Sequence, residues 1–110
     1  MAKAVFWHKG ESLDYKNSTS AEIKANDIIS LTTRIGVAGT DIPAGKVGSV
    51  ITEGVFKLPK TGTAAINIGA LVYFDVEDGG IDADKTNVPA GYAAESAAAA
   101  DTTILVKLLG

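Results

Sequence analysis

Histidine and cysteine, which often supply bases, nucleophiles and metal ligands, are almost absent from this chain. It has no cysteine, which excludes disulfides, thiolate metal sites and cysteine nucleophiles. Its one histidine, His8, stands beside Phe6, Trp7 and Lys9, where a packing or surface role is commoner than catalysis. A zinc site built on His8 would need three carboxylate or water ligands, which is an uncommon set. We therefore expect no metal and no cofactor.

Carboxylates gather between residues 75 and 84, in the sequence DVEDGGIDAD. An EF-hand loop needs oxygen ligands at positions 1, 3 and 5, glycine at 6 and glutamate at 12. Counted from Asp75, position 5 is Gly79 and position 12 is Thr86, so two ligands are missing. Asp75 and Asp82 could face each other across a hairpin, but an exposed turn is a poor setting for acid–base catalysis. We expect a hairpin with solvated charges, and no enzyme.

A phosphate-binding loop of the form G-x4-G-K-[ST] is nearly matched but fails in three ways. Five residues separate Gly39 from Gly45, Lys46 is followed by Val47, and Pro43 lacks a backbone donor. Nucleic-acid binding is also disfavoured, because 10 basic residues stand against 13 acidic ones, a net charge of -3. No apolar run approaches the roughly 20 residues of a membrane span. With no stretch of signal-peptide length at its start, the chain is expected to be soluble.

The elements that must carry any site are predicted to be short strands. Twelve glycines and three prolines separate runs rich in Val, Ile, Phe, Tyr and Thr, which is typical of an all-β sandwich or barrel. We expect a single compact domain over residues 1–110, with 1–17 as an N-terminal segment that contacts a partner. The predicted strands cover residues 4–9, 13–16, 28–32, 34–38, 47–52, 55–58, 71–76, 91–97 and 102–109.

Three segments share one pattern of a β-branched residue, two further residues and glycine: 42–45, 66–69 and 88–91. We interpret them as recurrent turns that use glycine where the backbone needs positive φ, rather than as a repeat architecture. The alanine-rich run 93–100 is too short for an independent helix, so it is predicted to be a strand followed by a turn.

In its order of segments the chain resembles a family of small tailed-phage and prophage proteins, the capsid cement or head-decoration proteins, some of which carry the label phage recombinase. The resemblance spans nearly the whole chain, and its most specific segments are GVFKLPK (54–60) and GALVYFD (69–75). It implies an all-β protein, made in the host cytoplasm and placed on the outer surface of the virion. Its implied partners are the major capsid protein and further copies of itself, as a homotrimer. A recombinase role lacks the phosphate loop.

The residues that would meet the capsid or another subunit are expected at two places. The first is the N-terminal aromatic cluster with Phe6, Trp7, His8 and Lys9, together with Tyr15, because exposed aromatics anchor interfaces. Equally, Phe6 and Trp7 could close one end of the β fold. The second is the small-residue stretch Ala97, Ala98 and Ala99, which would permit close backbone approach.

Two other functions stay open at this point. One is a minor virion structural or fibre-base protein, which would differ in the number of copies per virion. The other is a carbohydrate- or surface-binding β module, which would need an exposed aromatic platform over a shallow groove, with Trp7 or Tyr92 as candidates.

Overall fold

The computed structural model describes residues 1–110 and contains nine strands and no helix. The all-β prediction is thus confirmed, and no helix is present with the length and apolarity that crossing a membrane requires. The strands are β1 (Ser12–Lys16), β2 (Ile28–Ser30), β3 (Ile35–Ala38), β4 (Val47–Ile51), β5 (Val55–Pro59), β6 (Leu71–Asp75), β7 (Gly80–Asp82), β8 (Val88–Ala93) and β9 (Thr103–Leu108).

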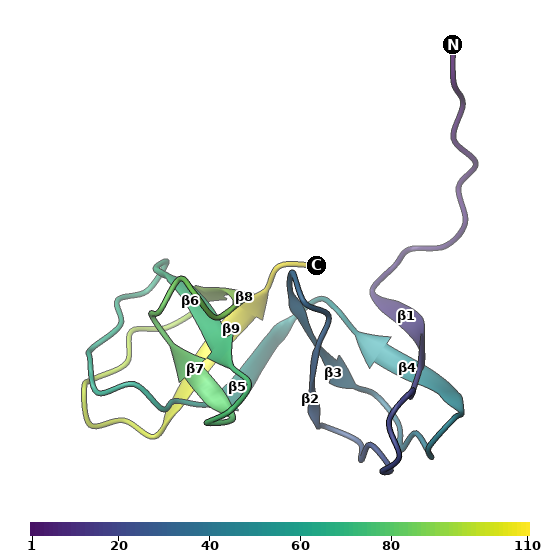
Figure 1. The fold of residues 1–110 in the computed structure, drawn as a ribbon. Helices are drawn as coiled ribbons and strands as arrows, with labels where there is room; N and C mark the ends of the chain where they lie inside the picture. The colour runs from purple at the N-terminus through teal and green to yellow at the C-terminus, as the bar shows by residue number, and fades with distance from the viewer.

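The strands form two antiparallel sheets, with the order β1-β4-β3-β2 in the first and β5-β9-β8-β6-β7 in the second. The sheets lie side by side as two lobes, and residues 1–11 leave β1 as an extended arm (Figure 1). An isolated parallel bridge between Lys60 and Ile81 brings β7 towards the end of β5. Neither sheet closes into a barrel, so the arrangement is sandwich-like.

Most predicted strands are observed within one or two residues, and two are corrected. Residues 4–9 form no strand because no other strand pairs with them, and every one of them is exposed. The strand expected at 91–97 is β8, which begins at Val88 and ends at Ala93. Its proline, Pro89, is tolerated because the pairing of β6 with β8 shifts register at Tyr73. The predicted hairpin is confirmed, with β6 and β7 joined by residues 76–79.

Two apolar clusters form the core. The larger has 13 buried residues, of which most belong to the second sheet. Ile35 and Val37 of β3 pack into it, so the two sheets share one cluster. The smaller cluster lies on the other face of the first sheet and consists of Ile29, Ala38 and Val50. Burying one such aliphatic side chain stabilises the fold by about 1.5–3 kcal/mol.

The two parts of the chain repeat one architecture: residues 12–51, the first half, and residues 55–108, the second half. The order β1-β4-β3-β2 corresponds to β5-β9-β8-β6, with β7 added beyond β6. The isolated bridge between Ile23 and Ile42 corresponds to the bridge between Ile66 and Ala97. Equivalent residues stand 43 positions apart up to the start of β6, namely Leu13 and Phe56, Tyr15 and Leu58, Asn17 and Lys60, and Ile23 and Ile66.

Backbone hydrogen bonds repeat in the same way. In the first half, Asn26 N donates to Ala38 O at 2.8 Å, and Ala38 N donates to Asp27 O at 2.9 Å. The second half has the same two bonds at 2.8 and 2.9 Å, from Gly69 N to Ala93 O and from Ala93 N to Ala70 O.

The repeat does not relate the three similar segments to one another, because it pairs Ile42 with Ala97 and Ile66 with Ile23. The interpretation of 42–45 and 66–69 as turns with glycine at positive φ agrees with the structure. Segments 42–45 and 66–69 occupy the same kind of place, a β-bridge followed by a turn and a strand. The third segment, 88–91, lies inside β8 and is not a turn. The 43-residue spacing is not evident in the sequence, because the halves share few identical residues and β7 with its flanking loops interrupts the second half.

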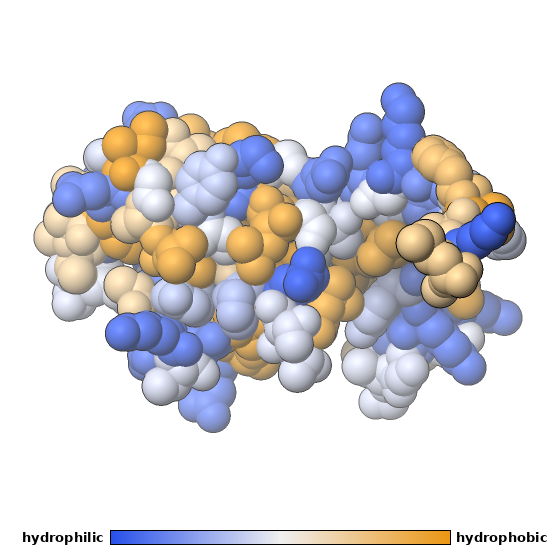
Figure 2. Space-filling view, turned by 90° about the horizontal axis from the view of Figure 1, so that it is seen from above, coloured by the Kyte–Doolittle hydropathy of each residue, from blue (hydrophilic) through white to orange (hydrophobic).

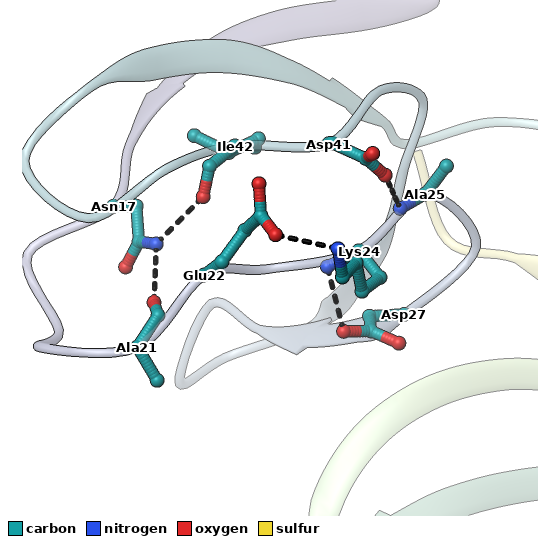
Figure 3. A network of polar contacts seen from close by, with 8 residues as sticks. All are labelled: Asn17, Ala21, Glu22, Lys24, Ala25, Asp27, Asp41 and Ile42. Carbon is teal, nitrogen blue, oxygen red and sulfur yellow. Dashed lines mark hydrogen bonds and ion pairs between the residues drawn. The ribbon is translucent and has the colours of Figure 1, made fainter.

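Asn17 is a fully buried polar side chain at the end of β1. Its Nδ2 donates to Ala21 O at 2.8 Å and to Ile42 O at 2.9 Å, as Figure 3 shows. Its Oδ1 accepts from the backbone N and the Oγ1 of Thr19 at 3.0 and 2.6 Å. One amide group therefore joins the connection after β1 to the connection before β4.

Lys60, at the equivalent place after β5, is also buried. Its Nζ donates to Gly62 O at 2.8 Å and to Ala99 O at 3.2 Å, so it joins the corresponding two connections of the second half. The residue types differ, but both positions place a side-chain donor between loop carbonyls. A covered carbonyl without a donor is costly, so the side-chain donors at both places stabilise these partly buried connections.

Gly91 lies where β8 passes closest to β9. A Cβ atom there would lie 1.9 Å from the backbone oxygen of Lys107, and the φ of +147° is one that side chains rarely adopt. Its equivalent, Gly36, would place a Cβ 2.4 Å from Cγ2 of Val50. Each half therefore needs a glycine at this position, which is Gly36 of β3 in the first half and Gly91 of β8 in the second.

We expect Gly91→Ala to lower the free energy of unfolding by about 3 kcal/mol or more, because a backbone atom of a central strand must move. Gly45→Ala is the matched control, since Gly45 also has positive φ, +75°, but no atom within 4 Å of the added Cβ. Its cost should be about 1 kcal/mol. Urea denaturation measures both, and equal losses would contradict the role of close strand approach.

Asn17→Ala should destabilise the protein by about 2–3 kcal/mol, because the Ala21 and Ile42 carbonyls lose their side-chain donor. Asn67→Ala, at an exposed position with no side-chain hydrogen bond, should change stability by less than about 0.5 kcal/mol. Thermal and urea unfolding give the comparison. A loss for Asn17→Ala no larger than that of the control would show that water replaces these bonds freely.

Candidate functional site

The most exposed large apolar side chains of the chain lie on the N-terminal arm, residues 1–11, and they include three besides the terminal Met1. The exposed fractions are 84% for Val5, 74% for Phe6 and 87% for Trp7. These side chains do not close an end of the β fold, since they pack against neither core cluster. The arm is anchored only at its base, where Thr52 N donates to Glu11 O at 3.0 Å.

His8 and Lys9 lie on the same arm and are exposed. The Nδ1 of His8 accepts a hydrogen bond from Gly10 N at 2.9 Å, which orients the ring locally and brings it to no carboxylate or nucleophile. The four arm residues predicted for an interface, Phe6, Trp7, His8 and Lys9, are therefore together on the surface.

The other predicted interface residues are placed differently. Tyr15 lies in β1, half-buried, and packs against the smaller core cluster. Ala97 is 7% exposed and pairs with Ile66, so its side chain supports the core. Ala98 and Ala99 are exposed in the turn that follows it. The structure thus does not bring the alanine turn and the aromatic arm together.

The acidic side chains of the β6–β7 region organise turns. Asp75 Oδ1 accepts from the backbone N of Glu77 and Asp78 at 3.0 and 3.1 Å. Asp75 pairs with Gly80, while Asp82 pairs with Tyr73, so the two aspartates are not opposite each other. No group of three or more His, Cys, Asp or Glu side chains is placed to hold a metal ion.

Asp84 and Lys24 have perturbed ionisation, and local hydrogen bonds are the cause at both. The backbone N and the hydroxyl of Thr86 donate to Asp84 and lower the pKa of its carboxyl group. The hydrogen bond of Lys24 with Glu22 raises the pKa of Lys24 (Figure 3). Both groups are exposed, and neither lies beside a nucleophile or in a buried pocket, so these shifts mark turn structure.

The second sheet carries a row of exposed side chains that the sequence did not identify as a candidate contact surface. Leu71 and Tyr92 are 63% and 40% exposed and stand opposite each other on β6 and β8. The only signal for it is the strict alternation along β9, which puts Lys107 on the face away from the core. Seen from the side towards which the arm extends, apolar residues lie among charged and polar ones on both lobes (Figure 2).

The surface hollows of the molecule are shallow, and their linings are mainly polar. The largest, about 420 Å³, is lined by residues of β5, β9 and the 95–102 connection, including Lys57, Glu95 and Asp101. Neither Trp7 nor Tyr92 lines any of the three hollows, so the aromatic platform over a groove expected of a carbohydrate-binding module is not formed. Exposed apolar side chains lie instead on the N-terminal arm and on one face of the second sheet.

Comparison with known proteins gives one match. A family model described as Phage cement protein matches residues 7–108, which include most of the aromatic cluster of the arm and all nine strands. No curated protein and no solved structure matches the chain. The family description indicates a structural role in a phage and an association with its capsid. Because the model covers nearly the whole chain, this chain belongs to the phage cement protein family.

Proposed function

We propose that the protein decorates the outer surface of the phage head and stabilises the expanded capsid by bridging subunits of the major capsid protein. The observation that carries the proposal is the exposed aromatic arm on a compact two-sheet body, in a chain of the phage cement family. Phe6 and Trp7 are largely exposed and belong to neither core cluster of their own chain. Large aromatic side chains of this kind are the commonest anchors of protein interfaces.

Stabilisation by such a protein is a linkage effect. A ligand that binds the assembled shell better than free subunits shifts the equilibrium towards the shell by its differential binding free energy. Each contact can be weak, because a chain that spans two capsid subunits makes its second contact at high effective concentration. The role is structural rather than catalytic, and it needs no cofactor, nucleic acid or membrane.

The body and the arm would serve different parts of this role. The body, acting as one unit over residues 12–110, supplies a rigid scaffold, and the arm supplies adaptable contacts with a neighbouring subunit. Self-association as a homotrimer, with the exposed turn residues Ala98 and Ala99 near the contact, would multiply the arms at one lattice position. The protein would be made in the host cytoplasm and added to the finished head.

The purified protein should co-sediment with expanded heads that lack it, and should not co-sediment with unexpanded proheads. Binding should saturate at a simple ratio to the major capsid protein, because each lattice position accepts one assembly. Absence of binding to both forms would refute the proposal and favour a minor virion or fibre-base role. Equal binding to both forms would refute the claim that the expanded capsid is stabilised selectively.

Replacing both Phe6 and Trp7 by serine should weaken binding to expanded heads by roughly tenfold or more, because two aromatic anchors are lost. Stability should stay unchanged, since neither side chain packs in the core. Ile68→Ser, which removes an apolar side chain of similar exposure, 65%, from the body, is the control and should bind normally. Normal binding by the arm variant would show that the arm is not the capsid-contacting element.

A further inference from the structure

One face of the second sheet has no partner in the structure. Strand registers align Val55 with Lys107, Lys107 with Tyr92 and Tyr92 with Leu71, so these four side chains form a row across β5, β9, β8 and β6. We call it the sheet row. Its apolar members are exposed by 53%, 40% and 63% for Val55, Tyr92 and Leu71. Lys107 Nζ lies 6.0 Å from the centroid of the Tyr92 ring and has no carboxylate partner.

The duplicated architecture shows what this face does when it is partnered. The equivalent row in the first sheet consists of Ser12, Ile51, Val37 and Ile28, which are aligned by the same registers. Val37 is only 2% exposed, because this face of the first sheet packs against the second half of the chain. The same sheet face is therefore an interface in one half and bare in the other.

The turn between β6 and β7 carries the opposite charge and is also without a partner. It consists of Val76, Glu77, Asp78 and Gly79, which we call the acidic turn. Val76 is 59% exposed, and the carboxylates of Glu77 and Asp78 form no ion pair or hydrogen bond. In the second half of this same chain, β6–β7 already lies beside the first sheet, where Phe74 and Gly79 line a hollow with Ile28.

The sheet row and the acidic turn stand at opposite ends of β6, since Leu71 begins the strand and Asp75 ends it. Five residues of extended chain separate Leu71 from Val76 by about 17 Å, so the two surfaces of one molecule cannot meet each other. A contact between unlike surfaces of two copies is heterologous, and such contacts close into rings when the rotation permits.

We propose that the sheet row binds the acidic turn of a second copy of this chain. Val76 would pack on Tyr92 and Leu71, and Lys107 would pair with Glu77 or Asp78. The inference rests on the proposed function for its biological setting, because it names the surfaces through which the decorating copies associate, but it is tested without the capsid.

Because the chain has no cysteine, engineered cysteines report this contact directly. Tyr92→Cys and Asp78→Cys, mixed under mild oxidation, should give disulfide-linked dimers that neither variant gives alone. Tyr92→Cys mixed with Lys46→Cys, an exposed position of the first half, is the control and should give none. Disulfide-linked dimers of Tyr92→Cys alone would overturn the heterologous contact. The contact would also be overturned if the mixture of Tyr92→Cys and Asp78→Cys formed no more dimer than the control mixture, both in solution and on heads.

Charge reversal gives an independent measurement by sedimentation velocity. Lys107→Glu should weaken self-association by roughly tenfold, and adding Glu77→Lys with Asp78→Lys in the same chain should restore it. Failure of the triple variant to recover would refute the pairing of these charges. If the chain binds heads but never self-associates, this inference is refuted and the proposed function is left intact. If the chain self-associates but does not bind heads, the proposed function is refuted and this inference is left intact.

Discussion

The fold depends on hydrogen bonds that satisfy the backbone of the long connections between very short strands. Strands of three to six residues cannot hold connections of eight or more residues by packing alone, and the backbone groups of a connection that is covered need partners. Asn17 and Lys60 each supply donors to two such connections. The bridges from Ile23 to Ile42 and from Ile66 to Ala97 close the same connections a second time. Without these ties, each half would be a small sheet with loose loops.

The same devices explain how the chain can carry an unpaired arm. The body shares one core between its sheets, and it uses only the last two residues of the arm, since the carbonyls of Gly10 and Glu11 accept hydrogen bonds from Thr52. No core residue or backbone hydrogen bond of the body involves residues 1–9. The aromatic residues of the arm therefore stay available for another protein. In the role proposed above, this division lets the body hold one lattice position while the arm contacts a neighbouring subunit.

The two halves share one architecture but differ in detail, and these differences make the molecule asymmetric. Both halves have the bridge–turn–strand arrangement, a buried donor and a close-packed glycine, but only the second half contains β7. One face of the first sheet packs into the core cluster that it shares with the second half, and Phe74 and Gly79 line a hollow beside it with Ile28, whereas the corresponding face of the second sheet is exposed. A two-fold repeat within one chain thus produces a molecule with two different ends, which is what head-to-tail association requires.

The amino-acid sequence by itself determined the local features: short strands separated by glycine turns, the β6–β7 hairpin and the resemblance to cement proteins. These depend on residue type and spacing over a few residues, where alternation and turn preference act directly. Only the tertiary structure decided that residues 4–9 have no strand partner, that Tyr15 and Ala97 face the core, and that Tyr92 and Leu71 face solvent. Alternation shows which side chains share a face, but which face becomes buried depends on pairing between residues more than 30 positions apart, and no local pattern encodes that choice.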